Sequence, residues 1–392
     1  MFGRQVVCPY CFEAFTSTEV AFRCIRPAGC PPEEDKPLSE YQRLTATMML
    51  PRVFVPPPGW RTPTAARCTC GTRSTKAVCP HCHNTLPGQF SATSHHTIAL
   101  IGAKGAGKSN YIAVLVHELR NKVGQRFNAA LNALDEQTIK RYREHFERFV
   151  YDKREVVPAT PSGMAALHYP LVYRLGITRR WLRFLRRNRA TTLVLFDTAG
   201  EDLGNSDTMA IATRYFASSH GLIFLLDPLQ IPAVRQLLGL PELAAGEAEP
   251  PGDIIFRVCE LIRKLRGIAP EQPIRIPVAI VFSKIDEVRR ILEPDSILNR
   301  ASEHDGAFDL ADADEVNETV RAHVNRWLGP NFHATLEQNF SLVRYFGISA
   351  LGDAPTDDGT LPRGVQAFRV EDPFLWLLQR NGYIKGERGA RA

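Results

Sequence analysis

The sequence lacks the segments that would tie it to a membrane. Among its 392 residues there is no run of eighteen apolar side chains, so we expect no transmembrane helix. The first residues, Met-Phe-Gly-Arg-Gln-Val-Val-Cys, contain no apolar signal-peptide core, and Phe2 stands where N-myristoylation requires glycine. We therefore expect a cytoplasmic protein.

Cysteine is almost absent beyond residue 82. Eight of the nine cysteines lie between Cys8 and Cys82. The ninth, Cys259, lies in a stripe of apolar residues at helical spacing, where we expect a buried core thiol. In a secreted chain the density near the start would indicate disulfides, whereas in a cytosolic chain it indicates metal binding.

Acidic residues are missing from one basic segment. Residues 179–189 hold six arginines and no acid, and the remaining 42 basic residues equal the 42 acidic ones in number. The net charge of +6 is therefore one local patch. The segment fits a solvated hairpin, or a surface for an acidic protein, a nucleic acid or an anionic membrane. Of the binding partners, an acidic protein is favoured. Its interleaved apolar residues are Trp181, Leu182, Phe184 and Leu185.

A glycine-rich motif follows a short apolar run. The four residues 98–101, Ile-Ala-Leu-Ile, fit a buried strand, and residues 110–120 fit a helix. Between them Gly-Ala-Lys-Gly-Ala-Gly-Lys-Ser is the phosphate-binding loop (P-loop) pattern, in which backbone N–H groups and a helix N-terminus surround phosphates. Lys108 is expected to reach the β and γ phosphates, and Ser109 to ligate Mg²⁺. The candidate phosphate-binding residues are Gly102, Ala103, Lys104, Gly105, Ala106, Gly107, Lys108, Ser109 and Asn110.

The chain divides into a cysteine-rich front region and an α/β region. Residues 1–90 carry the cysteines and include a Pro-rich insert at 31–66, expected to be a loop or linker. Residues 96–384 alternate strands with helices, which predicts a mostly parallel sheet with helices on both faces. Residues 385–392 are expected to be a flexible tail, and loops are expected at 227–252 and 296–311. We place strands at 97–101, 168–175, 192–196, 221–226, 274–282 and 344–348, and helices at 109–123, 134–152, 207–217, 253–267, 312–328 and 371–381.

A second motif favours GTP over ATP chemistry. The apolar run 192–196 ends in Asp197-Thr-Ala-Gly200. Asp197 is placed to hold Mg²⁺ and the Gly200 N–H to contact the γ-phosphate. Many P-loop ATPases carry a catalytic glutamate directly after this aspartate, but Thr198 follows here.

A third and a fourth motif predict guanine recognition. The apolar run 277–282 ends in Ser283-Lys-Ile-Asp286. A carboxylate at Asp286 can accept both N1–H and N2–H of guanine, a pair that adenine does not offer. The Lys284 stem can cover the base, and the backbone of Ser349-Ala350-Leu351 can approach the guanine O6. Candidate base-binding residues are Ser283, Lys284, Asp286, Ser349, Ala350 and Leu351.

In order and spacing these motifs resemble the Ras-like branch of the translation-factor-related P-loop GTPases. The resemblance covers roughly 96–380 and implies a six-stranded sheet, Mg²⁺-GTP binding and two switch loops. It also implies that residues 179–189 form a hairpin at the edge of the sheet. With its cysteine-rich front and an extended switch-one region at 124–165, the chain also resembles the bacterial double-GTPase group, whose work depends on partner proteins.

The sequence departs from the Ras-like pattern at several positions. Ser283 replaces Asn or Thr, and Leu351 replaces Lys. Glu201 stands where Gln is usual, which predicts slow intrinsic hydrolysis. Thr160 is the candidate switch-one threonine and third magnesium ligand, and the alternative is an ordinary Pro-rich turn. The candidate catalytic residues are Lys108, Thr160, Gly200 and Glu201.

These motifs lead us to expect a GTP-binding switch that hydrolyses GTP slowly or with a partner's help. The first alternative is a scaffold that holds nucleotide without hydrolysing it and docks proteins through its cysteine-rich region. The second is a nucleic-acid-linked nucleoside triphosphatase that uses the same region and the arginines.

Eight thiolates suit two tetrahedral Cys₄ zinc sites of structural type, and the alternatives are disulfides or an iron–sulfur cluster. Two Cys-Pro-x-Cys turns, at 8–11 and 79–82, each supply two ligands. The favoured grouping is sequential, and the alternative is crossed, with both turns in one site. The sequential sites are Cys8, Cys11, Cys24 and Cys30, then Cys68, Cys70, Cys79 and Cys82.

Overall fold

The computed structural model describes residues 3–26, 29–57, 59–88, 94–159, 169–182, 185–196, 213–244 and 249–388. At 94, 95, 179–182 and 185–188 it describes the backbone only. Among the helices of these ranges, none is both long and apolar enough to cross a membrane.

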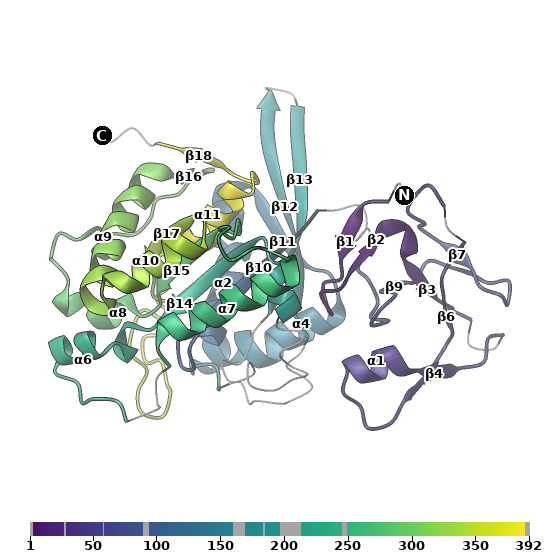
Figure 1. The fold of residues 1–392 in the computed structure, drawn as a ribbon, viewed down its shortest axis with the longest axis horizontal. Coiled ribbons are helices and arrows are strands. Elements are labelled where there is room, and N and C mark those ends of the chain that lie inside the picture. Colours follow the sequence, from purple (N-terminus) through teal and green to yellow (C-terminus); the bar gives the residue numbers. More distant parts are fainter. Residues whose placement is uncertain are drawn as a thin grey trace.

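A seven-stranded sheet forms the centre of the molecule (Figure 1), in the order β11-β12-β13-β10-β14-β15-β17. The five strands from β13 to β17 are parallel, and β11 and β12 are antiparallel to their neighbours. The parallel α/β prediction is confirmed, whereas the six-strand prediction is wrong because β11 adds an edge strand. The strands are β10 (Ser94–Gly102), β11 (Ala129–Ala133), β12 (Leu171–Leu182), β13 (Leu185–Phe196), β14 (Gly221–Leu226), β15 (Val278–Phe282) and β17 (Val343–Gly347).

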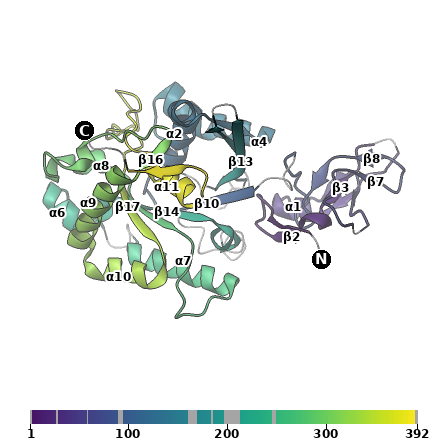
Figure 2. The same ribbon diagram turned by 90° about the horizontal axis from the view of Figure 1, so that it is seen from above.

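Helices cover both faces of the sheet (Figure 2). One apolar cluster joins one sheet face to α2 (Lys108–Arg120), η3 (Arg143–Lys153) and α11 (Asp372–Arg380). A second joins the other face to α7 (Pro251–Arg266), α9 (Leu310–Leu328) and α10 (Pro330–Asn339). Alternate β10 residues divide between them, since Ile98 belongs to the first cluster and Ala99 to the second. Between α2 and η3 lie α3 (Lys122–Phe127) and α4 (Glu136–Tyr142).

Several expected loops contain regular structure. The 227–252 loop holds η6 (Pro228–Gln230) and α6 (Pro232–Leu238). After β15 come α8 (Ile285–Val288), η7 (Arg289–Ile291) and η8 (Ile297–Asn299). The predicted flexible tail is wrong at its start, because β18 (Lys385–Glu387) pairs in parallel with β16 (Ala307–Asp309).

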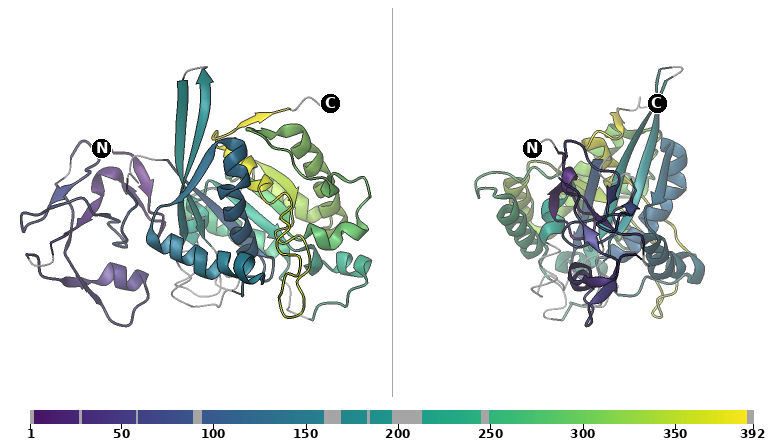
Figure 3. Two further views of the ribbon diagram at one scale, coloured as in Figure 1. Left: turned by 180° about the vertical axis from the view of Figure 1, so that it is seen from behind. Right: turned by 90° about the vertical axis from the view of Figure 1, so that its right-hand side faces the viewer.

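The arginine-rich segment is a hairpin of β12 and β13, as predicted, but it does not form the sheet edge. In its outer part, between the residue pair Thr178 and Asn188 and the residue pair Leu182 and Leu185, the two strands pair only with each other. It stands clear of the sheet in Figures 1 and 3. The edge position belongs to β11, which pairs with the inner part of β12.

The cysteine-rich region is built from short strands and turns. The Pro-rich insert 31–66, expected to be a loop, contains β4 (Glu33–Asp35), α1 (Lys36–Tyr41), β5 (Met48–Leu50), β6 (Val53–Phe54) and the start of β7. The region shares an apolar cluster with the main sheet. Its other elements are β1 (Gln5–Val7), β2 (Ala14–Thr16), η1 (Ser17–Glu19), β3 (Ala21–Arg23), β7 (Ala66–Arg67), β8 (Arg73–Ser74) and β9 (Ala77–Val78).

Candidate functional site: a P-loop pocket and two cysteine tetrads

The P-loop joins the end of β10 to the start of α2. Gly105 and Gly107 have φ angles of 75° and 85°, which glycine adopts without steric cost. A Cβ on Gly102 would lie 2.7 Å from the Leu225 carbonyl oxygen of the neighbouring strand β14. Glycine at these positions therefore lets the backbone turn tightly against the sheet.

Lys108 lies over this loop. Its Nζ donates to the carbonyl oxygens of Gly102 at 2.8 Å and Ala103 at 3.0 Å, and the residue is 8% exposed. The buried Lys108 ammonium group lies beside the backbone N–H groups of the P-loop, so this positively charged region can attract an anionic ligand. Ser109 and Asn110 follow in the first turn of α2.

One cavity brings the P-loop and both base motifs together. It has a volume of about 200 Å³ and lies where the carboxyl ends of β10, β15 and β17 meet. Ala103 instead lines a neighbouring cavity of about 960 Å³ beside α6 and α7. The predicted residues that line the first cavity are Gly105, Gly107, Asn110, Ser283, Lys284, Asp286, Ser349, Ala350 and Leu351.

Backbone bonds hold the two base motifs side by side. Ile285 N–H donates to the Ile348 carbonyl at 3.0 Å, and Lys284 pairs with Ser349 in an isolated β-bridge. The Ser349 hydroxyl accepts from Gly352 N–H at 2.7 Å, which fixes the turn that follows. The motifs, 63 positions apart, thus form one wall of the cavity.

A residue outside every motif anchors the lysine of the third motif. Lys284 Nζ lies 2.7 Å from Asp227 Oδ2, and the Asp227 side chain is 4% exposed. Asp227 also accepts from Leu229 N–H at 2.9 Å, so its position is fixed. An aspartate directly after an apolar strand is the sequence signal that could have indicated this anchor.

Two adjacent carboxylates, Asp286 and Glu287, line the base end of the cavity. Burial raises the pKa of Glu287, and the negative charge of Asp286 adds to that increase. A ligand that donates hydrogen bonds would relieve this crowding of negative charge.

A segment that the motifs do not include completes the cavity. Val156 and Val157 line it, and Val157 N–H donates to Asn110 Oδ1 at 2.9 Å. The same segment pairs with the chain after β17, because Val156 N–H donates to Gly359 O at 2.9 Å and Leu361 N–H to Arg154 O at 2.7 Å. Residues 154–157 therefore connect the P-loop helix to the 356–361 loop.

Four predicted residues lie outside the described part of the chain: Thr160, Asp197, Gly200 and Glu201. The described chain ends at Phe196, the last residue of β13, directly before Asp197, and at Ala159, two residues after Val157 of the cavity wall. Their roles remain predictions from the sequence.

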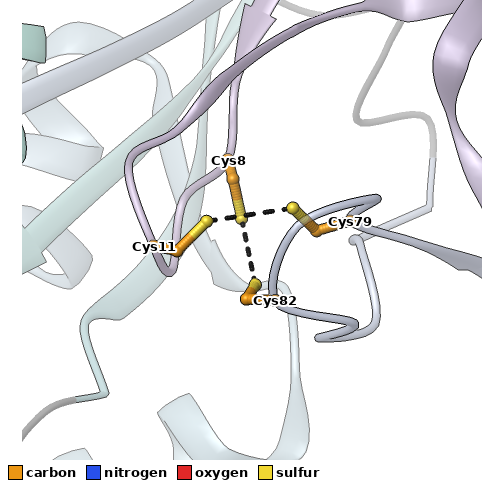
Figure 4. Close-up of side chains that lie close together, drawn as sticks. All are labelled: Cys8, Cys11, Cys79 and Cys82. Carbon is orange, nitrogen blue, oxygen red and sulfur yellow. Dashed lines mark hydrogen bonds between the residues drawn. The ribbon is translucent and has the colours of Figure 1, made fainter. Parts of the chain in front are cut away.

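The first cysteine tetrad joins the two Cys-Pro-x-Cys turns (Figure 4). Its sulfur atoms lie 3.8 Å apart in the pairs Cys8–Cys82 and Cys11–Cys79. A zinc ion with Zn–S bonds of about 2.3 Å requires S···S separations of roughly 3.8 Å. Tyr10 N–H points to Cys8 Sγ and His81 N–H to Cys79 Sγ, each at 3.4 Å, so both turns stabilise thiolate charge.

The second tetrad comprises Cys24, Cys30, Cys68 and Cys70. The Cys24–Cys70 and Cys30–Cys68 sulfur atoms lie 3.6 and 3.8 Å apart. Hydrogen bonding with Thr72 lowers the pKa of Cys70 to about 6. The donor set and spacing of both tetrads fit zinc, and four thiolates leave no ligand position for a substrate.

The predicted sequential grouping is wrong, and the crossed grouping is the one observed. The reason lies in the antiparallel pairing of β3 with β9, in which Ala21 faces Val78. Cys24 follows β3 and Cys79 follows β9, so they emerge at opposite ends of the pair. Arg23 N–H donates to Lys76 O at 2.9 Å, which brings Cys24 toward the chain before β9.

In a third group, the possible metal-ligating atoms of His304, Asp312 and Asp372 also lie within 4.8 Å of one another. Arg369, however, already pairs with both aspartates. The Arg369 guanidinium donates to Asp312 and Asp372 at 2.7 and 2.8 Å, and its side chain is fully buried. Burial alone would raise the pKa of Asp372, but the nearby His304 and the ion pair with Arg369 outweigh this and lower it. The group is therefore an ion-pair network that fastens α11 to α9.

The P-loop, the parallel sheet and the paired base motifs define a protein with the P-loop GTPase fold. Residues 96–351 match the family model described as Double-GTPase 2. This match spans more than half of the chain, so the protein belongs to the Double-GTPase 2 family.

Three relatives illustrate the similarity. The protein named Putative ESX-1 scaffolding and assembly protein SaeC, from Mycolicibacterium smegmatis, is 28% identical over 96% of this chain and 99% of its own length. The signal recognition particle receptor SRb-GTP/SRX complex from Chaetomium thermophilum is 15% identical over 68% of this chain and 95% of that one, with a TM-score of 0.31. The GTP-bound Ski7 GTPase-like domain of S. cerevisiae is 13% identical over 74% of this chain and 50% of that one, with a TM-score of 0.33.

Proposed function

We propose that this protein is a GTP-binding switch that binds Mg²⁺-GTP and Mg²⁺-GDP and hydrolyses GTP slowly or with a partner's help. The observation that carries the proposal is the single cavity lined by the P-loop, Ser283–Asp286 and Ser349–Leu351. A phosphate chain at the P-loop would place the base between Lys284 and Asp286. Family membership supports the same ligand class.

Each group has a defined role in this proposal. Lys108 and the P-loop N–H groups neutralise phosphate charge, Ser109 and Asp197 hold Mg²⁺ together with Thr160, and Gly200 contacts the γ-phosphate. Asp286 accepts hydrogen bonds from guanine and Asp227 keeps Lys284 in place. Glu201 is the candidate for orienting water, and its charge near phosphate is the reason for slow turnover.

Nucleotide titration tests the ligand. We expect GTP and GDP to bind at least about 100-fold more tightly than ATP. Lys108→Ala should weaken GTP binding about 10- to 100-fold, while Lys264→Ala on the exposed face of α7 should not. Asp286→Asn should reduce the preference for GTP over ATP, with the exposed Asp295→Asn as its matched control. Equal affinity for GTP and ATP in the unmodified protein would disprove guanine selection.

A second candidate function is a scaffold that holds nucleotide without hydrolysing it. The similarity to a protein whose name describes scaffolding and assembly favours it, as does Glu201 in place of Gln. A phosphate-release assay separates the two: turnover that Lys108→Ala abolishes supports the switch, and its absence supports the scaffold.

We also propose that each tetrad holds one structural zinc ion. When bound, zinc supplies a fixed tetrahedral cross-link between the chain segments that carry the cysteines. None of the nine cysteines, all of which lie in the described residues, forms a disulfide, which suits a reducing compartment, so we propose a cytoplasmic location. The cysteine-rich region and the arginine-rich hairpin are the proposed surfaces for protein partners.

A further inference from the structure

The first cysteine tetrad lies directly against the sheet that carries the nucleotide motifs. Phe12, which follows Cys11, is 4% exposed and belongs to the same apolar cluster as Phe196 and Tyr215. Its ring centroid lies 5.9 Å from that of Phe196 and 5.0 Å from that of Tyr215. Phe12 also has a φ of 58°, an uncommon conformation for a residue with a side chain, so the Cys-Pro-x-Cys turn holds it in place.

Both aromatic partners of Phe12 adjoin the second nucleotide motif. Phe196 is the last residue of β13 and directly precedes Asp197. Tyr215 lies in the helix 213–218, the first described element after that motif. Its hydroxyl donates to Ile98 O at 2.7 Å and accepts from Phe196 N–H at 3.3 Å, which ties it to β10 and β13.

A polar contact strengthens the same junction. Arg214 Nε donates to the carbonyl oxygen of Cys11 at 3.1 Å, and its Nη1 lies 3.1 Å from Glu13 Oε1. The chain on each side of residues 197–212 is thus in contact with residues 11–13, at the end of the first Cys-Pro-x-Cys turn. A comparable contact lies beyond the predicted switch-one region, where the Tyr41 and Tyr169 ring centroids are 5.2 Å apart at 80°.

We propose that the Phe12 loop couples the first cysteine tetrad to the nucleotide site, so that the cysteine-rich region responds to whether GTP or GDP is bound. The inference rests on the proposed nucleotide-binding function. The Asp197–Gly200 motif is covalently joined to Phe196, and a shift of Phe196 or Arg214 must change their packing on Phe12 and Cys11. Because such coupling is reciprocal, the loop must also influence the relative affinity for the two nucleotides.

The test measures the ratio of the dissociation constants for GDP and a non-hydrolysable GTP analogue in the full-length, zinc-loaded protein. Phe12→Ala is expected to change this ratio by about five-fold or more, the lower end of typical allosteric couplings. Arg214→Ala leaves the cysteine loop intact and should change it in the same direction. The matched control, Phe54→Ala, removes a ring that contacts Phe22 within the cysteine-rich region, and it should leave the ratio unchanged.

A second readout follows from reciprocity. Amide hydrogen exchange at residues 8–13 should differ between the GDP-bound and analogue-bound protein, and this difference should be lost in Phe12→Ala. Unchanged ratios in both contact variants, with two zinc ions retained, would overturn the inference. A protein that binds neither nucleotide overturns the proposed function itself, whereas tight binding with an unchanged ratio overturns only the coupling.

Discussion

At the scale of single residues, motif spacing could predict which residues line the cavity, but not what holds them in place. Ser283–Asp286 and Ser349–Leu351 are recognisable in the sequence, and the structure brings both sets to one cavity. Motif spacing does not reveal Asp227, because its partner Lys284 lies 57 positions away and no motif joins them; only its place directly after an apolar strand signals it. The cysteine grouping failed for the same reason, since the antiparallel pairing of β3 and β9 decides it.

Asp227 gives the first prediction. Asp227→Ala leaves the Lys284 ammonium without its carboxylate partner, and we expect the dissociation constant for GTP to rise about five- to ten-fold. Isothermal titration measures the effect. Asp309→Ala is the matched control, because Asp309 likewise caps a helix and accepts from backbone N–H groups but lies away from Lys284. A similar loss of affinity in both variants would contradict the anchoring role.

At the scale of elements, apolar runs could be predicted from the sequence, and strands of weak propensity could not. The central strands β14 and β15 are continuous apolar runs that are buried at every position. The missed strand β11 reads Ala-Ala-Leu-Asn-Ala and has little strand propensity, so its pairing with β12 determines its structure. The missed strand β18 has only three residues and forms by pairing with β16.

The 154–157 segment gives a second prediction. Because it bonds to Asn110 on one side and to the 356–361 loop on the other, it closes one wall of the cavity. Asn110→Ala removes the first bond, worth about 1 kcal/mol, and should speed GDP release roughly five-fold. Release of a fluorescent GDP measures the rate. Asn121→Ala at the other end of α2 is the control, and equal rates in the two variants would exclude the proposed wall.

At the scale of the whole molecule, one apolar cluster crosses the boundary between the two regions. It contains Cys8 and Phe12 from the front region and Phe196 and Tyr215 from the α/β region. The sequence could predict two regions from composition, but not a shared core, because residues from separate regions carry no common periodicity. Loss of the first metal site should therefore lower the stability of the whole chain.

Cys8→Ser tests this expectation. The variant should retain about one zinc ion per chain instead of two, and its unfolding midpoint should fall by about 5 °C or more, which is roughly 4 kcal/mol for a protein of this size. Metal analysis and calorimetry measure the two effects. Cys259→Ser is the matched control, because Cys259 is buried in α7 and lies in neither tetrad. Two zinc ions in the Cys8→Ser protein would show that the first tetrad does not hold the metal.

The crossed grouping has a consequence for biosynthesis. The four close cysteine pairs are nested, with sequence separations of 38, 46, 68 and 74 residues from the inside outward. As the chain leaves the ribosome, the inner tetrad becomes complete at Cys70, and the outer one only at Cys82. At about 5–20 residues per second, the inner site has a lead of roughly one second. Its closure shortens the loop that the outer site must still close, which lowers the entropic cost of the second step. The order of the cysteines along the chain thus favours closure of the inner tetrad before the outer one.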